Sequence, residues 1–180
     1  MKLLLDTCVL YPTVMREMLL GAARLGHFVP LWSGRILGEW ERAAVKLGPV
    51  GAAQAKAEIV LIRNTWPQAE LAPAPGLETR LWLPDAGDIH VLASAISGSA
   101  DAIVTMNNKD FPRNILAEEG LVRFGPDELL HGFWLQDNAG LQQLGQQLLA
   151  EASRLSGKEW QIRPLLKKAR LPRLAKALAG

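Results

Sequence analysis

Short apolar runs and longer stretches with helical spacing alternate through the first 125 residues. The apolar runs at residues 2–5, 28–32, 101–105 and 121–124 predict buried strands. The intervening stretches predict helices at residues 9–24, 33–47, 50–65, 85–96 and 115–119. Apolar strands that alternate with amphipathic helices are typical of βαβ units. We therefore expect an α/β fold with a central parallel sheet covered by helices on both faces.

The helix after the second strand has a start signal and a clear apolar stripe. Ser33 is expected to cap it. The stripe consists of Ile36, Trp40, Ala43 and Leu47. Glu39 lies about 60° from Ile36 at about 100° per residue, so it can either lean over the sheet edge or face solvent.

The character of the chain changes after Pro126. Residues 127–156 are rich in Gln and Leu and almost wholly compatible with helix, and Gly157 is expected to end this stretch. Residues 165–178 predict a basic amphipathic helix that Pro172 breaks. We therefore divide the chain into a domain at residues 1–125 and a helical, basic extension at residues 126–180.

Composition and cysteine content narrow the class of protein. Of 180 residues, 49% are hydrophobic and 21% charged, which indicates a globular protein with a sizeable core. The single cysteine, Cys8, excludes an internal disulfide framework and a cysteine zinc cluster, and it fits a reducing cytoplasm. Asp6 interrupts the opening apolar run, and no apolar stretch approaches the ~18 residues of a membrane span. We expect a cytoplasmic protein with no membrane partner.

Positive charge is concentrated near the end of the chain. Between Arg154 and Lys176 there are eight basic residues and one acid, Glu159, although the net charge of the whole chain is only +2. The other residues carry a net charge of −5. The basic segment is compatible with a polyanionic partner, with an acidic protein surface, or with a solvated helical face.

Four acids fall at comparable places in the predicted fold. Asp6 follows the first strand, Glu39 lies in the helix after the second, Asp88 lies in the first turn of its helix, and Asp110 follows the strand at 101–105. Because right-handed crossovers bring the carboxyl ends of parallel strands to one edge, these side chains are expected to meet there. Clustered carboxylates repel each other strongly without a cation, and oxygen ligands suit Mg²⁺ or Mn²⁺.

Each acid also has a structural explanation when taken alone. Asp6 can cap the following helix, and Asp85 and Asp88 both suit the positive end of a helix dipole. Asp110, beside Asn107 and Asn108, suits a turn. Only the four positions together favour a metal site.

Other reactive residues leave alternatives open. His90 is a general base, a helical partner to the Asp88 turn or a packed histidine. Cys8 is either a nucleophile or a small buried side chain. A phosphatase with Asp6 as nucleophile commonly needs a second Asp two residues on, where this chain has Cys8. The chain also lacks the G-x-x-x-x-G-K-[ST] loop of nucleoside triphosphatases.

Aromatic and basic side chains can serve the core or a nucleic acid. The six tryptophans, including Trp40, can stack bases or fill the core, and the spacing of Trp40 favours the core. Arg16 and Arg35 are candidate phosphate contacts, or exposed and solvated.

Four segments resemble the PIN domain, in particular the VapC-type toxins of bacterial toxin–antitoxin pairs. They are LLLDTCVLYP at residues 3–12, SGRILGEW at 33–40, PDAGDIHVLA at 84–93 and IVTMNNKDFP at 103–112. They occur in the family's order. The segment LPRLA at residues 171–175 is similar to the C-terminal extension of one VapC subgroup.

The resemblance implies a three-layer α/β/α sandwich and a Mg²⁺- or Mn²⁺-dependent endoribonuclease. It implies a toxin that cuts RNA, is held off by a cognate antitoxin protein and pairs as a homodimer. Asp6, Glu39 and Asp88 carry over as metal ligands, and all three are catalytic together with Asp110. Further support or substrate contacts are expected from Thr105, Asn107, Arg16 and Ser33.

The chain departs from the family pattern at two positions. Cys8 stands where many members have Asn, and Asn107 stands where many have an acid. Either Asp110 completes the site, Asn107 acts as a neutral ligand, or three acids suffice. Asn107 also motivates a second hypothesis, a catalytically weak PIN fold that binds RNA or a protein partner.

Overall fold

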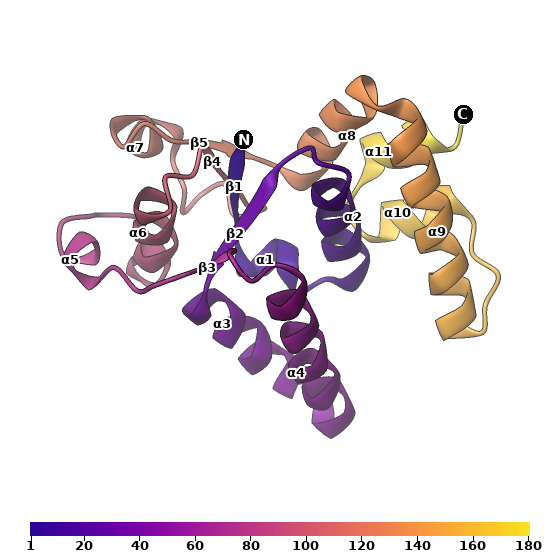
Figure 1. Cartoon of the computed structure of the whole chain (residues 1–180), viewed down its shortest axis with the longest axis horizontal. Coiled ribbons are helices and arrows are strands. Elements are labelled where there is room, and N and C mark those ends of the chain that lie inside the picture. Colours follow the sequence, from indigo (N-terminus) through magenta and orange to yellow (C-terminus); the bar gives the residue numbers. More distant parts are fainter. The chain divides into compact units, whose positions relative to one another are not determined.

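The computed structural model describes residues 1–180 and separates into two compact units. The first unit consists of Met1–Tyr11 and Val29–Phe124, and the second of Pro12–Phe28 and Gly125–Gly180. Figure 1 labels the elements of both units.

The first unit contains a five-stranded sheet in which every pair of neighbours is parallel. In the order β3-β2-β1-β4-β5, its strands are β3 Glu70–Leu71, β2 Val29–Ser33, β1 Lys2–Leu5, β4 Ala102–Val104 and β5 Val122–Phe124. The central strand β1 pairs through Leu4 with Leu31 on one side and Ile103 on the other. Leu3, Leu4 and Leu5 are completely buried. All four predicted strands are present, and the two-residue β3 is additional.

Helices surround this sheet, and the architecture is the predicted α/β/α sandwich with additional C-terminal helices. The helices of the first unit are α1 Thr7–Leu10, α3 Gly34–Val45, α4 Gly48–Thr65, α5 Pro75–Glu78, the 3₁₀ turn η1 Ala86–Asp88, α6 Ile89–Ser97 and α7 Arg113–Glu118. Helix α6 packs against β1, β2 and β4, and α3 packs against β2 and α4. The connections from strand to helix place the polar residues that follow β1 and β4 at one edge of the sheet.

Helix α3 confirms the predicted cap and corrects the predicted stripe. The Ser33 hydroxyl accepts a hydrogen bond from the Ile36 N–H at 3.2 Å. Its buried residues are Ile36, Leu37, Trp40 and Ala44. Leu47, predicted to face inward, is 65% exposed. The reason is that α3 ends at Val45, so Leu47 lies in the turn to α4 and no longer follows the helical period.

The helix expected over residues 9–24 is two helices. Helix α1 ends at Leu10, and α2 comprises Thr13–Arg24. Pro12 between them has an extended backbone, with ψ 118°. Proline has no N–H to continue the α1 hydrogen bonds, and its extended backbone turns the chain out of the helix. The boundary between the two units falls at this break.

The second unit is helical. It contains α2, α8 Pro126–Gln136, α9 Asn138–Ser156, α10 Ile162–Lys168 and α11 Pro172–Leu178. Gly157, with φ 64°, ends α9, and Pro172 begins α11, as predicted. Asp127 accepts hydrogen bonds from the N–H groups of Arg173 and Leu174 at the start of α11. No helix of the chain combines the length and the apolarity needed to cross a bilayer.

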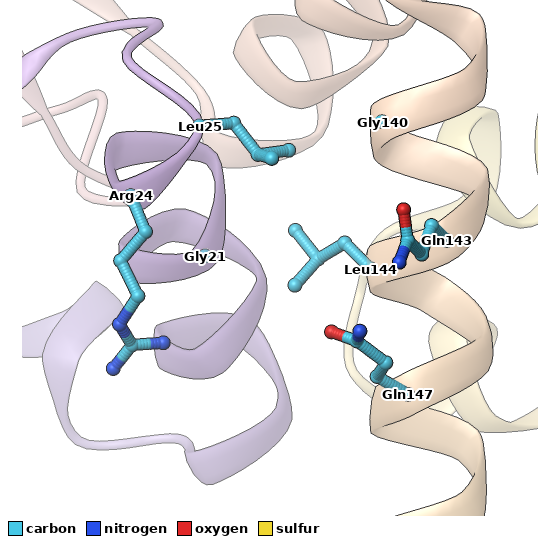
Figure 2. A pocket seen from close by; sticks show the side chains of 7 residues that line it. All are labelled: Gly21, Arg24, Leu25, Gly140, Gln143, Leu144 and Gln147. Atoms are coloured by element: carbon cyan, nitrogen blue, oxygen red, sulfur yellow. The ribbon is translucent and has the colours of Figure 1, made fainter.

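Helix α2 packs against α8 and α9 rather than joining the sheet-containing unit. Figure 2 shows Leu144 of α9 directed toward Gly21 of α2, beside a pocket that Arg24, Gln143 and Gln147 also line. A Cβ at Gly21 would collide with the Leu144 side chain, so glycine permits this close approach. The contact division places Pro12–Phe28 and Gly125 in the second unit, whereas the division predicted from the sequence places both in residues 1–125.

Candidate metal centre

Carboxylates gather near the carboxyl edge of the sheet, within the first unit. Asp6 follows β1, and Asp110 lies in the loop after β4. Asp85 directly precedes the turn η1, and Asp88 is the last residue of that turn. Carboxylate oxygens of Asp85, Asp88 and Asp110 all lie within 4.8 Å of one another. This acidic triad joins segments that are separate in sequence.

The triad overlaps only partly with the residues assigned from the sequence. Asp88 and Asp110 were predicted site residues, whereas Asp85 was interpreted only as a helix cap. Asp85 does act as a cap, because its Oδ1 accepts a hydrogen bond from the Gly87 N–H at 2.8 Å. Asp6 and Glu39 are outside the triad. Both are fixed by hydrogen bonds to other side chains.

Asp6 is buried and held by two donors. Its Oδ2 accepts a hydrogen bond from Thr105 Oγ1 at 2.7 Å and from Cys8 Sγ at 3.1 Å. The Thr105 hydroxyl in turn accepts from the Asn107 N–H at 3.0 Å. Because a buried carboxylate needs such partners, Thr105 and Cys8 fix the position of Asp6.

Cys8 acts as a neutral donor in this network. Burial, followed by the charge of Asp6, raises the pKa of its thiol to about 12. The thiol therefore keeps its proton near neutral pH and donates it to Asp6, while Sγ accepts a hydrogen bond from the Met106 N–H at 3.3 Å. A nucleophilic cysteine needs the thiolate, so this environment favours the structural interpretation of Cys8.

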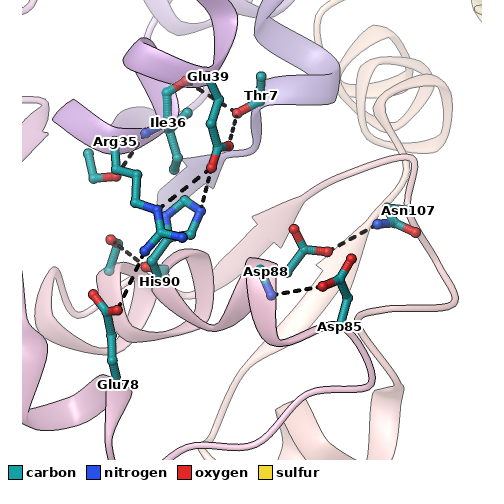
Figure 3. Close-up of polar contacts among 12 residues, drawn as sticks. Thr7, Arg35, Ile36, Glu39, Glu78, Asp85, Asp88, His90 and Asn107 are labelled. Atoms are coloured by element: carbon teal, nitrogen blue, oxygen red, sulfur yellow. Dashed lines mark hydrogen bonds and ion pairs between the residues drawn. The ribbon is translucent and has the colours of Figure 1, made fainter. Parts of the chain in front are cut away.

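Glu39 is oriented from two sides, as Figure 3 shows. Its Oε2 accepts a hydrogen bond from Thr7 Oγ1 at 2.8 Å, and its Oε1 lies 2.8 Å from His90 Nε2 and 3.8 Å from Arg35 Nε. Burial alone would raise the pKa of Glu39. The hydrogen bonds from His90 and Thr7, together with the charges of His90 and Arg35, lower it. Glu39 is thus a fixed carboxylate.

His90 has a role that the sequence did not indicate. Its side chain is buried on α6 and faces Glu39 of α3. Neither a general base nor a merely packed histidine describes this contact, because the ring positions a carboxylate from another helix. The two residues are far apart in sequence, so only the folded structure shows the pair.

The pKa of Asp88 indicates that negative charge around this residue is not balanced. Burial raises its pKa to about 6 from an ordinary 3.8, and the charges of Asp6, Asp85, Asp110 and Glu39 add to the shift in that order. Its Oδ2 accepts a single hydrogen bond from Asn107 Nδ2, at 3.2 Å. Five carboxylates therefore act on one another around Asp88, with little positive charge to balance the triad.

This donor set fits a small divalent cation. Carboxylate oxygens are the ligands preferred by Mg²⁺ and Mn²⁺, and like charges at this separation favour either protonation or a bound cation. Burial first, and then repulsion from the neighbouring carboxylates, raises the pKa of Asp88. Asp85, Asp88 and Asp110 are thus able to hold a metal, with Asp6 the neighbour whose charge acts most strongly on Asp88.

The remaining residues predicted as contacts lie in different environments. Ser33 is buried and its hydroxyl caps α3, which gives it a role in the fold. Arg16 belongs to α2 of the second unit and is 1% exposed, with Nε 3.7 Å from Glu17. It is therefore neither an exposed phosphate contact nor a solvated arginine. Arg35 is exposed and lies near Glu39 and Glu78.

A family model described as PIN domain matches residues 2–109, more than half of the chain. The chain belongs to the PIN-domain family. The match includes Asp6, Glu39, Asp85 and Asp88, and ends one residue before Asp110. No curated protein and no solved structure matches the chain. PIN domains are in general metal-dependent nucleases, and the acidic triad of this PIN domain is a cluster able to bind metal.

Proposed function

We propose that this PIN domain is an endoribonuclease that requires Mg²⁺ or Mn²⁺ and hydrolyses phosphodiester bonds in RNA. The observation that carries the proposal is the acidic triad, whose carboxylate oxygens lie within 4.8 Å of one another, with the charges of Asp6 and Glu39 also acting on Asp88. A structural cap or turn would not need five acids to face one another. A nuclease site does, because it must hold a cation beside a phosphate.

Asp88 is the centre of the proposed site. With Asp85 and Asp110 it would hold the ion, and Asp6 supplies the next carboxylate. When bound, the ion would activate a water molecule and neutralise the charge that develops on the phosphate. Thr105 and Cys8 keep Asp6 oriented through its Oδ2. Arg35 is the exposed cation nearest Glu39 and offers a charge for the substrate phosphate.

Glu39 contributes a fixed negative charge rather than a mobile proton. Its lowered pKa means that it stays ionised while Asp88 titrates. His90 Nε2 and Thr7 Oγ1 each face one of its oxygens, so the carboxylate cannot rotate freely. This arrangement suits an outer group that orients water or the ion's coordination shell.

We further infer that the nuclease is the toxin of a bacterial toxin–antitoxin pair. The support is the resemblance of the four ordered motifs to VapC-type toxins. Under this proposal the partner is an antitoxin protein, the toxin pairs as a homodimer, and the site of action is the cytoplasm, where its RNA substrate lies. Growth arrest on expression, relieved by the product of an adjacent small gene, is the expected result. Growth that continues while active protein accumulates would contradict the toxin role.

A cleavage assay with metal removal tests the nuclease directly. Labelled single-stranded RNA is incubated with the purified protein and Mg²⁺ or Mn²⁺, then with EDTA, then with the metal restored. Cleavage should appear, stop and return, and Asp88→Asn should be inactive while its circular dichroism is unchanged. Full activity in EDTA would contradict the proposal. RNA that is bound but never cut with either ion would instead indicate a non-catalytic binding module.

A further inference from the structure

The second unit carries an excess of positive charge. It contains ten basic and six acidic residues, for a net charge of +4, whereas the first unit has a net charge of −2. Helices α10 and α11, shown in yellow in Figure 1, hold most of the excess. We call the exposed basic residues of these helices and of the turn between them the α10–α11 basic surface: Arg163, Lys167, Lys168, Arg170, Arg173 and Lys176.

These six side chains are directed outward because the apolar positions of both helices are buried. The buried positions are Leu165, Leu166, Leu171, Leu174, Ala175 and Leu178. None of the six basic residues has a carboxylate within ion-pair distance. Asp127, the acid that contacts this region, accepts hydrogen bonds from backbone N–H groups at the start of α11. The positive charge of the surface is therefore not balanced within the fold.

Arg170 occupies a backbone position that usually favours glycine. Its φ is 61°, in the left-handed region. Its N–H donates to the Lys167 carbonyl at 3.0 Å, and the next N–H, that of Leu171, donates to the Leu166 carbonyl at 2.9 Å. These two bonds form a Schellman motif at the end of α10, with Arg170 at its left-handed residue.

The same motif elsewhere in this chain uses serine once, at Ser99 (φ 50°) after α6, and glycine twice. Gly26 ends α2 and Gly120 ends α7 with equivalent pairs of hydrogen bonds and with φ values of 89° and 71°. At Arg170 the backbone accepts strain that glycine would avoid. The turn does not need the guanidinium, which lies exposed between two basic helices. The left-handed turn therefore tolerates a side chain without requiring arginine, and the Arg170 guanidinium adds an exposed charge to the basic surface.

The chemistry of the surface identifies the ligand. An amphipathic helix that inserts into a membrane needs a free apolar face, and both apolar faces here are buried. A protein interface needs an apolar centre, and α10 and α11 expose no large hydrophobic residue. Regularly spaced lysines and arginines without either feature fit a phosphodiester backbone. Lys168, whose Nζ lies 5.2 Å from the Trp160 ring centroid, also places an aromatic ring beside the surface.

We propose that the α10–α11 basic surface binds the phosphate backbone of single-stranded RNA. The choice of RNA rests on the proposed ribonuclease function, whereas the binding of a polyphosphate chain rests on the surface itself. The binding requires no divalent metal, because the contacts are between phosphates and ammonium or guanidinium groups. It should therefore persist when the acidic triad is disabled.

Binding of a labelled single-stranded RNA in EDTA tests the surface apart from catalysis. The triple variant Lys167→Gln, Lys168→Gln, Arg170→Gln should weaken binding by about tenfold or more. It should also lower the slope of log affinity against log salt concentration by about 2, because each of the three lost phosphate contacts contributes about 0.7 to that slope. The matched control neutralises three exposed basic residues of the first unit, Arg42, Lys46 and Arg113, and should bind like the unmodified protein.

Arg170 offers a variant that separates binding from folding. Arg170→Gly relieves the backbone strain, so its melting temperature should not fall, yet its RNA affinity should. Arg170→Lys keeps the charge and should retain most of the affinity. Weaker binding by a variant that is at least as stable cannot be attributed to unfolding.

The outcomes distinguish this inference from the nuclease proposal. Unchanged RNA affinity in the triple variant would overturn the RNA surface and leave the nuclease untouched. Equal affinity for polyglutamate of matched charge would also overturn it, in favour of an acidic protein partner. If the protein never cleaves RNA but binds it through this surface, the RNA-binding proposal is supported and the nuclease proposal is contradicted.

Discussion

The two units of the chain each leave one sign of charge unbalanced, but in different surroundings. Around Asp88 the charges are negative and partly buried. Hydrogen bonds from Thr105 and Cys8 hold Asp6, and an ion pair with His90 holds Glu39. On the α10–α11 basic surface the charges are positive, exposed and without ion-pair partners. Close, partly buried charges shift a pKa and require a compact counter-ion. Exposed, dispersed charges attract an extended counter-ion.

Removing the carboxylate of Asp88 should have the largest effect on the contrast between the two units. Asp88→Asn should lower the rate of RNA cleavage by about 10³-fold, because it removes the group that the other acids surround. The variants Asp110→Asn and Asp6→Asn should follow, and Asp85→Asn, at an exposed cap, should lose least. Initial rates at saturating Mg²⁺ measure the ranking. Glu118→Gln, in an exposed part of α7, is the control. An Asp88→Asn enzyme as active as this control would contradict the account.

The hydrogen bonds that hold Asp6 provide the next test. Thr105→Val removes the donor at 2.7 Å from Asp6 and should lower cleavage by about 10- to 100-fold. Thr105→Ser keeps the hydroxyl and should recover most of the rate. A purely structural role would instead lower the melting temperature and the rate in parallel. Equal rates for the Val and Ser variants would show that the hydroxyl does not position Asp6.

Kinetics on a long and a short RNA substrate should separate the contributions of the two units. Neutralising Lys167, Lys168 and Arg170 should raise KM for a long RNA by about tenfold and leave kcat unchanged, because the surface binds substrate equally before and during reaction. The effect should disappear with a dinucleotide substrate too short to reach a second binding surface. Steady-state kinetics on both substrates make the comparison. A fall in kcat on the short substrate would show that the variant disturbs the metal centre.

The smallest expected effect is the pH dependence of stability. A carboxyl whose folded pKa is raised to about 6 contributes stability that is fully present below pH 3.8 and is lost as pH rises to about 6. Metal-free protein should therefore lose melting temperature over this window relative to Asp88→Asn. Excess Mg²⁺ should stabilise the protein more at about pH 7 than at about pH 5, because the ion displaces a proton. Parallel melting curves for the two proteins would contradict the pKa assigned to Asp88.

Much of the fold follows from the sequence because its signals are local. The strands at residues 2–5 and 101–105 are apolar runs, and Ser33 is a capping residue directly before a helical stripe. The acids that follow these strands are expected at one edge by the geometry of parallel sheets. In contrast, β3 is two residues long and lies at least partly exposed, so no apolar run in the sequence predicts it.

The parts that could not be predicted depend on contacts between distant residues. The pairing of His90 with Glu39 and the approach of Asp85 to Asp110 arise only after folding. Cys8 is explained by burial beside Asp6, which the sequence does not show. Neither the break at Pro12, inside the stretch predicted as one helix, nor the burial of Arg16 in a second unit was predicted.

The account depends on one divalent ion held by the carboxylates around Asp88. Anomalous diffraction from crystals soaked in Mn²⁺ tests this directly, since Mn²⁺ has an anomalous signal and the same oxygen preference as Mg²⁺. The account predicts a peak at direct coordination distance, about 2.1 Å, from an Asp88 oxygen and from at least one of Asp6, Asp85 and Asp110. Fully occupied Mn²⁺ sites elsewhere, with none at Asp88, would contradict it.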